Sequence, residues 1–422
     1  MKVIKLMIVF FLSIIFCFCS SDDVNEEVNK SGNEQNLILE LELEYNNSIF
    51  STVISDNEIT PKRLLPYDAK QIKVKSLRLS NGTKANLKEG DLLEISNQSL
   101  IITVDCEDGL SSFNYTVNLP KYEYASIVEK HGRLQVKGSE IVGKDGQSVS
   151  LAGNSFFWSN EGWGGNRYYN ASVVSWLKLD WGTTIIRAAM GVDESGGYLE
   201  NKTANVNSLK TLVDAAIDEG LYVIIDWHSH HAEDYPNEAV EFFSEMARLY
   251  GEYDNIIYEI YNEPLDVSWD KVIKPYAEKV IAAIRQHDPD HLIVVGTPEW
   301  SQRVDLAAEN PITGYSNIAY VMHFYSVHHQ QWLRDRTNAA MDSGLPIMVT
   351  EWGSLGYTQN DPETEKWMEW CKARQIIHCN WAVNDKQEEW SIVKPGVSVV
   401  GNWKEYNLTQ AGKLARSIIR EW

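Results

Sequence analysis

The chain has 422 residues, a formal net charge of −21 and 15 tryptophans. Its length suits one large domain together with a small one. The strong acidity excludes a broad basic surface of the kind that binds nucleic acid or anionic membranes. Aromatic residues make up 11% of the chain, more than a core requires, so some tryptophans are candidates for flat binding platforms.

Residues 1–19 have the pattern of a signal peptide. Two lysines are followed by the apolar run Ile8–Phe18, which is too short to span a bilayer comfortably. The run ends at Cys19, and the acidic residues after it resemble the surface-export signal of Bacteroidetes lipoproteins. We therefore expect a lipid on Cys19, anchoring at the outer-membrane surface, and a disordered polar tether over residues 20–36. Free secretion to the extracellular space is the alternative.

Residues 37–120 are rich in strand patterns. Leu39, Leu41 and Leu43 alternate with glutamates, which predicts a strand with one buried face. Turn dipeptides separate further strand runs, which are Ile72–Leu79, Leu92–Ile95, Leu100–Val104 and Phe113–Leu119. These features predict a small antiparallel β-sandwich. Its last part resembles the immunoglobulin-like modules of secreted Bacteroidetes proteins, for which we expect a spacer role, with carbohydrate binding as the alternative.

After a linker at residues 121–131, strand runs alternate with helical patterns over residues 132–422. The predicted strands are Val149–Phe157, Thr183–Met190, Leu221–Trp227, Asn255–Asn262, Leu292–Thr297, Ile318–Tyr325, Ile347–Glu351 and Ile377–Val383. The predicted helices are Ala171–Asp180, Ala204–Glu219, Asn237–Tyr250, Trp269–His287, Arg303–Glu309, Gln331–Asp342, Glu363–Arg374 and Thr409–Arg420. This order predicts an α/β fold, the (β/α)8 TIM barrel, whose active sites lie at the C-terminal ends of the strands.

Two of the apolar strand runs lead to a glutamate. Glu263 follows the fourth predicted strand in an Asn-Glu-Pro turn, and Glu351 ends the seventh. A buried strand ends in a carboxylate only where that group has a partner or a chemical role. Two carboxylates at the rim of a barrel are the arrangement of a glycosidase, in which one attacks the anomeric carbon and the other protonates the leaving oxygen.

The motifs IYEIYNEP, VTEWG, HFYSVHH, IIDWHSHH and IIRAAM resemble those of glycoside hydrolase family 5, in its bacterial endoglucanase (cellulase) branch. The resemblance covers residues 132–422. It implies a retaining endo-β-1,4-glucanase that cleaves internal bonds of cellulose or related β-glucans by double displacement, with Glu263 as acid/base and Glu351 as nucleophile. It implies a polysaccharide partner. We expect no nucleic-acid partner, because of the charge, and no metal or cofactor. We expect a monomer that meets a membrane only through its lipid.

The resemblance also assigns the residues around the two carboxylates. Arg187 matches the arginine that supports the nucleophile, and its charge would keep Glu351 ionised. Tyr325 matches the tyrosine that hydrogen-bonds the nucleophile, and His323 matches the histidine beside the acid/base. Asn262 matches the residue that binds the sugar 2-hydroxyl.

Other matching positions would contact the sugar chain. His228 and Trp381 match a histidine contact and a stacking platform at the cleavage subsite. Lys386 and Glu388 match residues further along the non-reducing side, and Trp300 matches an aromatic residue on the leaving-group side.

The chain departs from part of the branch. Some members have a histidine in the first strand's motif, where this chain reads GNSFFW, and a tyrosine where it has Gly191. Trp158 or Trp163 would then supply the platform. Glu259 shares strand parity with Glu263, and we interpret it as a structural carboxylate that needs a buried partner.

Alternatives remain open. The same machinery can act on β-mannan, xyloglucan or mixed-linkage glucan, because the subsite loops decide the polymer. A non-catalytic surface glycan-binding lipoprotein is a second alternative, for which a missing glutamate would be expected. His228, His230 and His231 suggest zinc, but no partner with matching spacing accompanies them.

Overall fold

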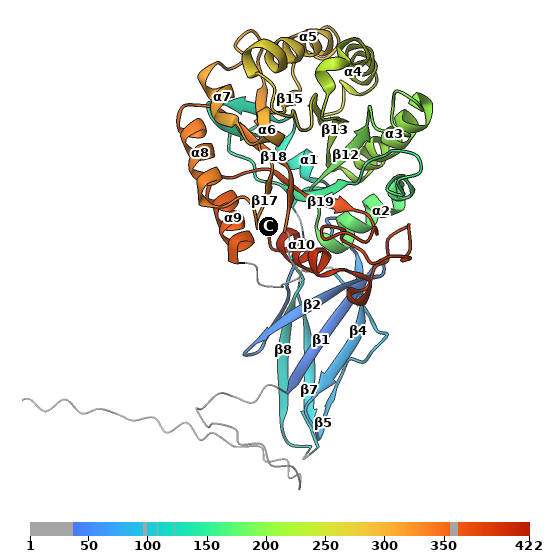
Figure 1. Cartoon of the computed structure of the whole chain (residues 1–422). Helices are drawn as coiled ribbons and strands as arrows, with labels where there is room; N and C mark the ends of the chain where they lie inside the picture. The colour runs from blue at the N-terminus through green and yellow to red at the C-terminus, as the bar shows by residue number, and fades with distance from the viewer. Residues whose placement is uncertain (1–36, 96–98, 108, 122, 355–361) are drawn as a thin grey trace, which may run out of the picture. The chain divides into compact units, whose positions relative to one another are not determined.

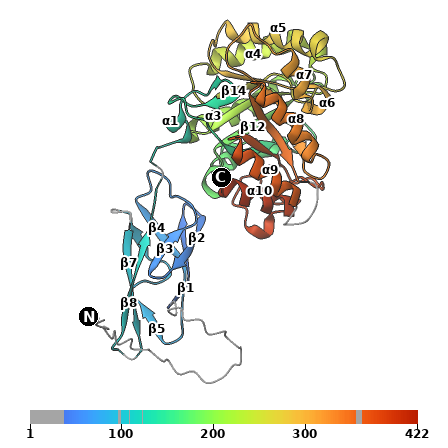
Figure 2. The ribbon, with the colours of Figure 1, turned by 90° about the vertical axis from the view of Figure 1, so that its left-hand side faces the viewer.

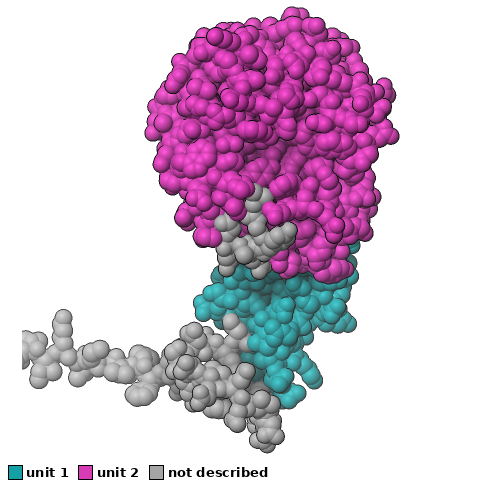
Figure 3. All heavy atoms as spheres, viewed as in Figure 1, with its two compact units in different colours: residues 1–122 teal, residues 123–422 magenta. Residues whose placement is uncertain are grey.

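The computed structural model describes residues 37–95, 99–107, 109–121, 123–354 and 362–422. The predicted signal peptide, Cys19 and the predicted tether lie outside these residues. The chain divides into two compact units, residues 1–122 and 123–422 (Figure 3). No helix within the described ranges is long and apolar enough to span a membrane.

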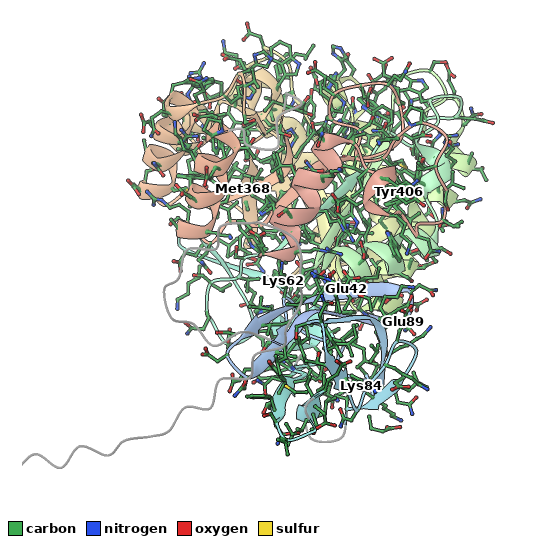
Figure 4. The ribbon with its side chains drawn as sticks, turned by 90° about the horizontal axis from the view of Figure 1, so that it is seen from below. Glu42, Lys62, Lys84, Glu89, Met368 and Tyr406 are labelled. Atoms are coloured by element: carbon green, nitrogen blue, oxygen red, sulfur yellow. The ribbon has the colours of Figure 1, made fainter. Side chains whose placement is uncertain are left out.

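The N-terminal unit is a β domain. Its strands are β1 (Ile38–Tyr45), β2 (Ser48–Ser55), β3 (Glu58–Pro61), β4 (Gln71–Leu79), β5 (Thr83–Ala85), β6 (Leu92–Glu94), β7 (Ser99–Cys106) and β8 (Ser112–Asn118). They are ordered β5-β7-β8-β3-β2-β1-β4-β6. Figure 4 labels charged side chains on two of them, Glu42 on β1 and Lys84 on β5. The core is formed by buried aliphatic side chains such as Ile38, Val74 and Ile102.

Two details differ from the predicted antiparallel sandwich. Strands β3 and β8 run parallel, and β8 also pairs with β7 on its other side. Leu39 was expected on the buried face and is instead 46% exposed. A register shift between Ile38 and Glu40 changes the alternation of β1 at this point.

The second unit is the predicted (β/α)8 barrel. Helices surround its ring of strands in Figures 1 and 2. The order of the strands closes on itself, since β11 pairs with both β12 and β19, and β16 pairs with β18. These parallel strands are β11 (Ala152–Phe156), β12 (Ile185–Gly191), β13 (Tyr222–His228), β14 (Ile256–Glu259), β15 (Leu292–Val295), β16 (Ile318–Val321), β17 (Phe324–Tyr325), β18 (Ile347–Gly353) and β19 (His378–Val383).

The sixth predicted strand is interrupted. It was expected over Ile318–Tyr325, and the structure divides it into β16 and β17. The cause lies at His323, whose N–H donates to the carbonyl of Ser301 at 2.9 Å instead of joining the sheet. Ser301 ends the short segment Pro298–Ser301 that follows β15. This interruption turns the backbone of His323 away from the regular ladder.

The helices follow the predicted pattern, except that the short segment α6 was not predicted and has positive φ at residues 299–301. They are α2 (Ala171–Trp176), α3 (Lys202–Glu219), α4 (Pro236–Tyr250), α5 (Lys274–Arg285), α6 (Pro298–Ser301), α7 (Val304–Glu309), α8 (Gln331–Asp342), α9 (Pro362–Ala373) and α10 (Gln410–Arg420). Short π-type or 3-10 segments add η1 (Asn166–Tyr168), η2 (Leu177–Trp181), η3 (Ala232–Asp234), η4 (Trp269–Ile273) and η5 (Glu405–Asn407). Local signals explain the ends: Pro236 occupies the first turn of α4, and Gly220 closes α3 with a φ of 65°.

The segment before the barrel contains structure that the sequence did not predict. Helix α1 (Ile127–His131) lies in the predicted linker, where the Ser126 side chain caps its first turn. A hairpin of β9 (Gln135–Lys137) and β10 (Glu140–Val142) follows. Leu134 and Ile141 from this region join the apolar cluster of the lower barrel.

The barrel interior changes from apolar to polar along the strands. The lower layer is one buried cluster, which includes Ile185, Ile224, Ile257 and Met348. Two residues further along the same strands lie four buried polar residues, namely Arg187, Asp226, Glu259 and Thr350. Because alternate side chains of a strand face the same side, both layers point inward. The polar groups therefore collect at the C-terminal rim, as expected for this fold.

Candidate active site

Arg187 lies at the centre of the site. Strand β12 carries it into the barrel, where its side chain is fully buried. Its Nε and Nη2 donate to the two oxygens of Glu259 at 2.7 and 3.1 Å. Nη1 donates to Glu351 Oε2 at 2.9 Å, and Nη2 donates to Asn262 Oδ1 at 2.7 Å. Burial disfavours the guanidinium charge, but the carboxylates of Asp226, Glu259 and Glu351 outweigh this cost and raise the pKa of Arg187 above its usual range.

A bulge in β18 brings Glu351 into the site. Near its end, β18 has one residue more than its neighbour β19, so the adjacent residues Thr350 and Glu351 both reach the interior. Glu351 Oε1 accepts a hydrogen bond from the Tyr325 hydroxyl at 2.6 Å, and Arg187 donates to the other oxygen. Burial, and then the nearby carboxylate of Glu351, raise the pKa of Tyr325, so its hydroxyl remains a donor. Glu351 is thus fixed at both oxygens.

The Asn262-Glu263-Pro264 turn places Glu263 just beyond β14. A left-handed stretch of three residues, with φ of 57° at Glu299, Trp300 and Ser301, supports this turn. The Ser301 hydroxyl donates to the Asn262 carbonyl at 2.8 Å. The Trp300 N–H donates to the Pro264 carbonyl at 2.8 Å. The strained stretch therefore positions the backbone that carries Glu263.

Two histidines contact the carboxyl group of Glu263. His323 Nδ1 lies 2.9 Å from Oε1, and His230 Nε2 lies 3.3 Å from Oε2. Burial raises the pKa of the Glu263 carboxyl, while His230 and His323 outweigh burial when both rings donate and hold this pKa below its usual value. The His230 side chain is 32% exposed and that of His323 only 1%. His230 therefore marks the open side of the site.

Aromatic rings line the site beside His228. His228 Nδ1 lies 2.7 Å from Asp226 Oδ2. Its ring is parallel to that of Trp381, with centroids 5.1 Å apart, and meets Trp158 edge-on at 4.1 Å. Burial and the charge of Arg187 hold the pKa of His228 well below its usual value, so the ring is neutral.

The predicted sugar-contact residues gather near these rings, with one exception. Lys386 Nζ lies 4.3 Å from the Phe157 ring centroid, and Glu388 lies 3.4 Å from Lys386. Phe157 is 5.5 Å from Trp381, ring to ring. Trp300 is 47% exposed and adjoins the turn of Glu263 through its backbone instead.

Three residues of the site were not predicted to belong to it. Asp226 and Thr350 received no role, and His230 was considered only as a metal ligand. Strand parity with His228 could have placed Asp226 in the interior. No sequence signal marks the bulge that admits Thr350, or the turn that brings His230 to Glu263.

The same cluster has the spacing of a three-ligand metal site. Ligand atoms of Glu263, His323 and Glu351 lie within 4.8 Å of one another. Each of these side chains already has a protein partner, which is His230, Thr350 and Tyr325 respectively. Of the three histidines considered for zinc, His228 and His230 contact Asp226 and Glu263 instead. We therefore interpret the cluster as two neighbouring carboxyl groups, Glu263 and Glu351, each held by its own protein partners.

Comparisons with known proteins show the family of the chain. The family profile described as Cellulase (glycosyl hydrolase family 5) matches residues 142–387. Endoglucanase Z of Dickeya dadantii is 49% identical over 293 residues, which cover 68% of this chain and 66% of that protein. An endoglucanase of Clostridium saccharobutylicum is 42% identical over 296 residues, covering 68% and 65%. The match thus spans slightly less than two thirds of these relatives.

Solved structures give the same result. A structure from Cytophaga hutchinsonii has a TM-score of 0.67 and 49% identity, covering 70% of this chain and 96% of that one. The catalytic domain of Thermobifida fusca endoglucanase Cel5A has a TM-score of 0.65 and 32% identity, covering 69% and 99%. The chain belongs to glycosyl hydrolase family 5.

Proposed function

We propose that this chain is a retaining endo-β-1,4-glucanase that hydrolyses cellulose or related β-glucans. The observation that carries the proposal is the pair of carboxyl groups, since an oxygen of Glu263 and an oxygen of Glu351 lie within 4.8 Å of each other. Retaining glycosidases hold their carboxyl groups about 5–5.5 Å apart, whereas inverting enzymes need about 6.5–9.5 Å to admit a water. The short separation favours retention.

The surroundings of the two groups suit different roles. Glu351 is held by a charged donor and a hydroxyl, Arg187 and Tyr325, which stabilise a carboxylate ready to attack. Among the described residues the carboxyl group of Glu263 contacts two histidines, His230 and His323, and its side chain is 13% exposed. Such a group can exchange a proton with a ligand in the cleft.

The proposed reaction has two steps. In the first, a Glu351 oxygen bonds the anomeric carbon while the glycosidic C–O bond breaks and Glu263 gives its proton to the leaving oxygen. In the second, Glu263 takes a proton from water, the water oxygen bonds the anomeric carbon, and the bond to Glu351 breaks. Two inversions at one carbon give net retention.

The aromatic rings support a glucan chain as the substrate. Trp158 and Trp381 flank His228, and Trp158 also contacts the ring of His230, which lies beside Glu263. A pyranose offers a flat C–H face to such rings. Lys386 and Glu388 add polar contacts on the same side. The Thermobifida fusca domain, at 32% identity, has been solved in complex with cellotetraose.

Hydrolysis of a polysaccharide panel tests this function. We expect reducing ends to appear faster from carboxymethylcellulose than from barley mixed-linkage glucan, mannan or xyloglucan. Proton NMR at early times should show the β-anomer of the new reducing end first, before mutarotation. A preference for mannan would contradict the glucanase assignment, and the α-anomer as first product would contradict retention. Absence of hydrolysis on every polymer would favour a glycan-binding lipoprotein.

We also propose that Cys19 carries a lipid that anchors the enzyme at the outer-membrane surface, with the N-terminal β domain as an immunoglobulin-like spacer. The apolar run before Cys19 and the acidic residues after it support this placement. In cells fed a radiolabelled fatty acid, the wild-type chain should carry label and sediment with membranes. Cys19→Ala should lose the label and appear in the soluble fraction. An unlabelled wild-type chain in the culture medium would contradict the anchor.

A further inference from the structure

A chain of hydrogen bonds, buried except where it reaches Glu263, links Glu259 to Glu263. Glu259 Oε1 lies 2.7 Å from the Thr350 hydroxyl, which donates to it. The Thr350 oxygen lies 2.8 Å from His323 Nε2. His323 Nδ1 lies 2.9 Å from Glu263 Oε1. The proposed glucanase mechanism uses only the last member of this chain.

The direction of the first bond follows from Arg187. Its Nε and Nη2 donate to both oxygens of Glu259, the paired geometry that favours an ionised carboxylate. Burial opposes that ionisation and raises the pKa of Glu259, as it does for Asp226. Among the described residues, Asp226 Oδ1 has no hydrogen-bond partner. Because both oxygens of Glu259 already accept from Arg187, Glu259 is the acceptor in its hydrogen bond with the Thr350 hydroxyl.

The hydroxyl of Thr350 has one proton, and it donates this proton in its hydrogen bond to Glu259. Thr350 can then offer only a lone pair to His323, so His323 must present Nε2–H to it. In a neutral imidazole the other nitrogen, Nδ1, is left with a lone pair. That lone pair faces Glu263 and can only accept a proton from it.

We propose that Glu259 and Thr350 are positioning residues that fix the tautomer of His323, and thereby keep the acid proton in the hydrogen bond between Glu263 and His323. If His323 instead presented Nδ1–H, Glu263 would be held ionised and could not act as the acid. This proposal rests on the glucanase mechanism and adds how its acid stays protonated.

The proton balance follows the two reaction steps. In the first step the proton shared by Glu263 and His323 moves to the leaving oxygen. Glu263 is then ionised, and its oxygen faces the unprotonated Nδ1 of His323. The Glu263 carboxylate is a stronger base because this nitrogen donates no hydrogen bond to it. In the second step Glu263 recovers a proton from the attacking water, and the original state returns.

Removing the Thr350 hydroxyl should shift the pH dependence of glucan hydrolysis. In Thr350→Val, the His323 proton can move to Nδ1 and stabilise ionised Glu263, so the acid proton is lost at lower pH. The basic limb of kcat/KM should move down by about one pH unit, which lowers activity on that limb by about tenfold. Thr350→Ser keeps the hydroxyl and should retain the wild-type profile.

Other titratable groups around the pair are unchanged in these variants. Those that face Glu263 or His323, besides Glu259, are Arg187, Asp226, His228, His230, Tyr325, His329 and Glu351. A shift that appears in the valine variant and is absent in the serine variant is therefore assigned to the hydroxyl. Identical profiles for the two variants would overturn the proposal.

Two further measurements separate this role from a structural one. With an aryl cellobioside whose leaving group needs no protonation, kcat/KM of Thr350→Val should match the wild type, and an equal loss on both substrates would overturn the proposal. Glu259→Gln offers an amide N–H₂ that donates to Thr350 and reverses the chain, so its basic limb should also move to lower pH. An unchanged limb in that variant would count against the role of Glu259.

The tautomer can be observed without any activity. Nitrogen-15 NMR of the imidazoles, with His323 assigned by its loss in His323→Gln, should show neutral His323 protonated at Nε2 in the wild type. Protonation at Nδ1 in the wild type would overturn the proposal, even if the chain hydrolysed no glucan. A failure of the proposed function would appear instead in the polysaccharide panel.

Discussion

Glu351→Gln is expected to lower kcat for glucan hydrolysis by at least about 10³-fold while leaving the chain folded. The amide has the shape of the carboxylate but no anionic oxygen to bond the anomeric carbon. Arg187 and Tyr325 each donate to one oxygen of Glu351, and an amide can accept only one of these bonds well. The measurements are initial rates on carboxymethylcellulose, with thermal unfolding as the check on folding.

A covalent label makes this test specific. A 2-fluoro cellobioside with a good leaving group should add one glycosyl mass to the wild-type chain at Glu351, and none to Glu351→Gln. Glu365→Gln, on the exposed surface of α9, is the matched control and should keep wild-type rates and labelling. Turnover by Glu351→Gln above about a tenth of the wild-type rate would remove Glu351 from the nucleophile role.

The barrel could be predicted because its strands and helices differ in period. Continuous apolar runs mark strands covered on both faces, and they alternate with helical patterns. The predicted helix Gln331–Asp342 has the same bounds as α8. The rule that barrel sites lie at the C-terminal rim then placed Glu263 and Glu351 near each other before any distance was known.

The supporting contacts could not be predicted in the same way. The bulge in β18 makes Thr350 and Glu351 both face inward. No particular residue type marks such a bulge in the sequence. The left-handed stretch at residues 299–301 has no glycine, so the usual signal of positive φ is missing. Tertiary packing, rather than local preference, holds both features.

The N-terminal unit illustrates a second limit. Alternation of leucine and glutamate predicted the strand β1 but assigned Leu39 to the wrong face. The hydrophobic pattern also gave no information on strand partners, so the parallel pair of β3 and β8 was unforeseen. The hydrophobic pattern of a sequence indicates where strands lie. The partner of each strand depends on which strand edges are still unpaired in the folded sheet.

Glu263→Ala is expected to separate the two steps of the reaction. On glucans, whose leaving oxygen needs a proton, kcat/KM should fall by about 10²–10⁴-fold, the usual contribution of a general acid. On an aryl cellobioside with a leaving group of low pKa, bond cleavage needs no proton and the first step should stay close to its wild-type rate. The second step still lacks its base, so aryl release should show a rapid burst followed by slow turnover.

Adding azide to the Glu263→Ala variant tests whether the missing side chain is the base of the second step. Azide is a nucleophile that needs no base, and loss of the Glu263 side chain opens space on the side where His230 is exposed. Added azide should therefore restore steady-state turnover of the aryl substrate and give a β-glycosyl azide, because the covalent intermediate on Glu351 is attacked from the opposite face. Glu309→Ala, at the exposed end of α7, should show neither burst nor azide effect. Equal losses on glucan and aryl substrate, without rescue, would mean that Glu263 supports the fold of the rim and is not its acid.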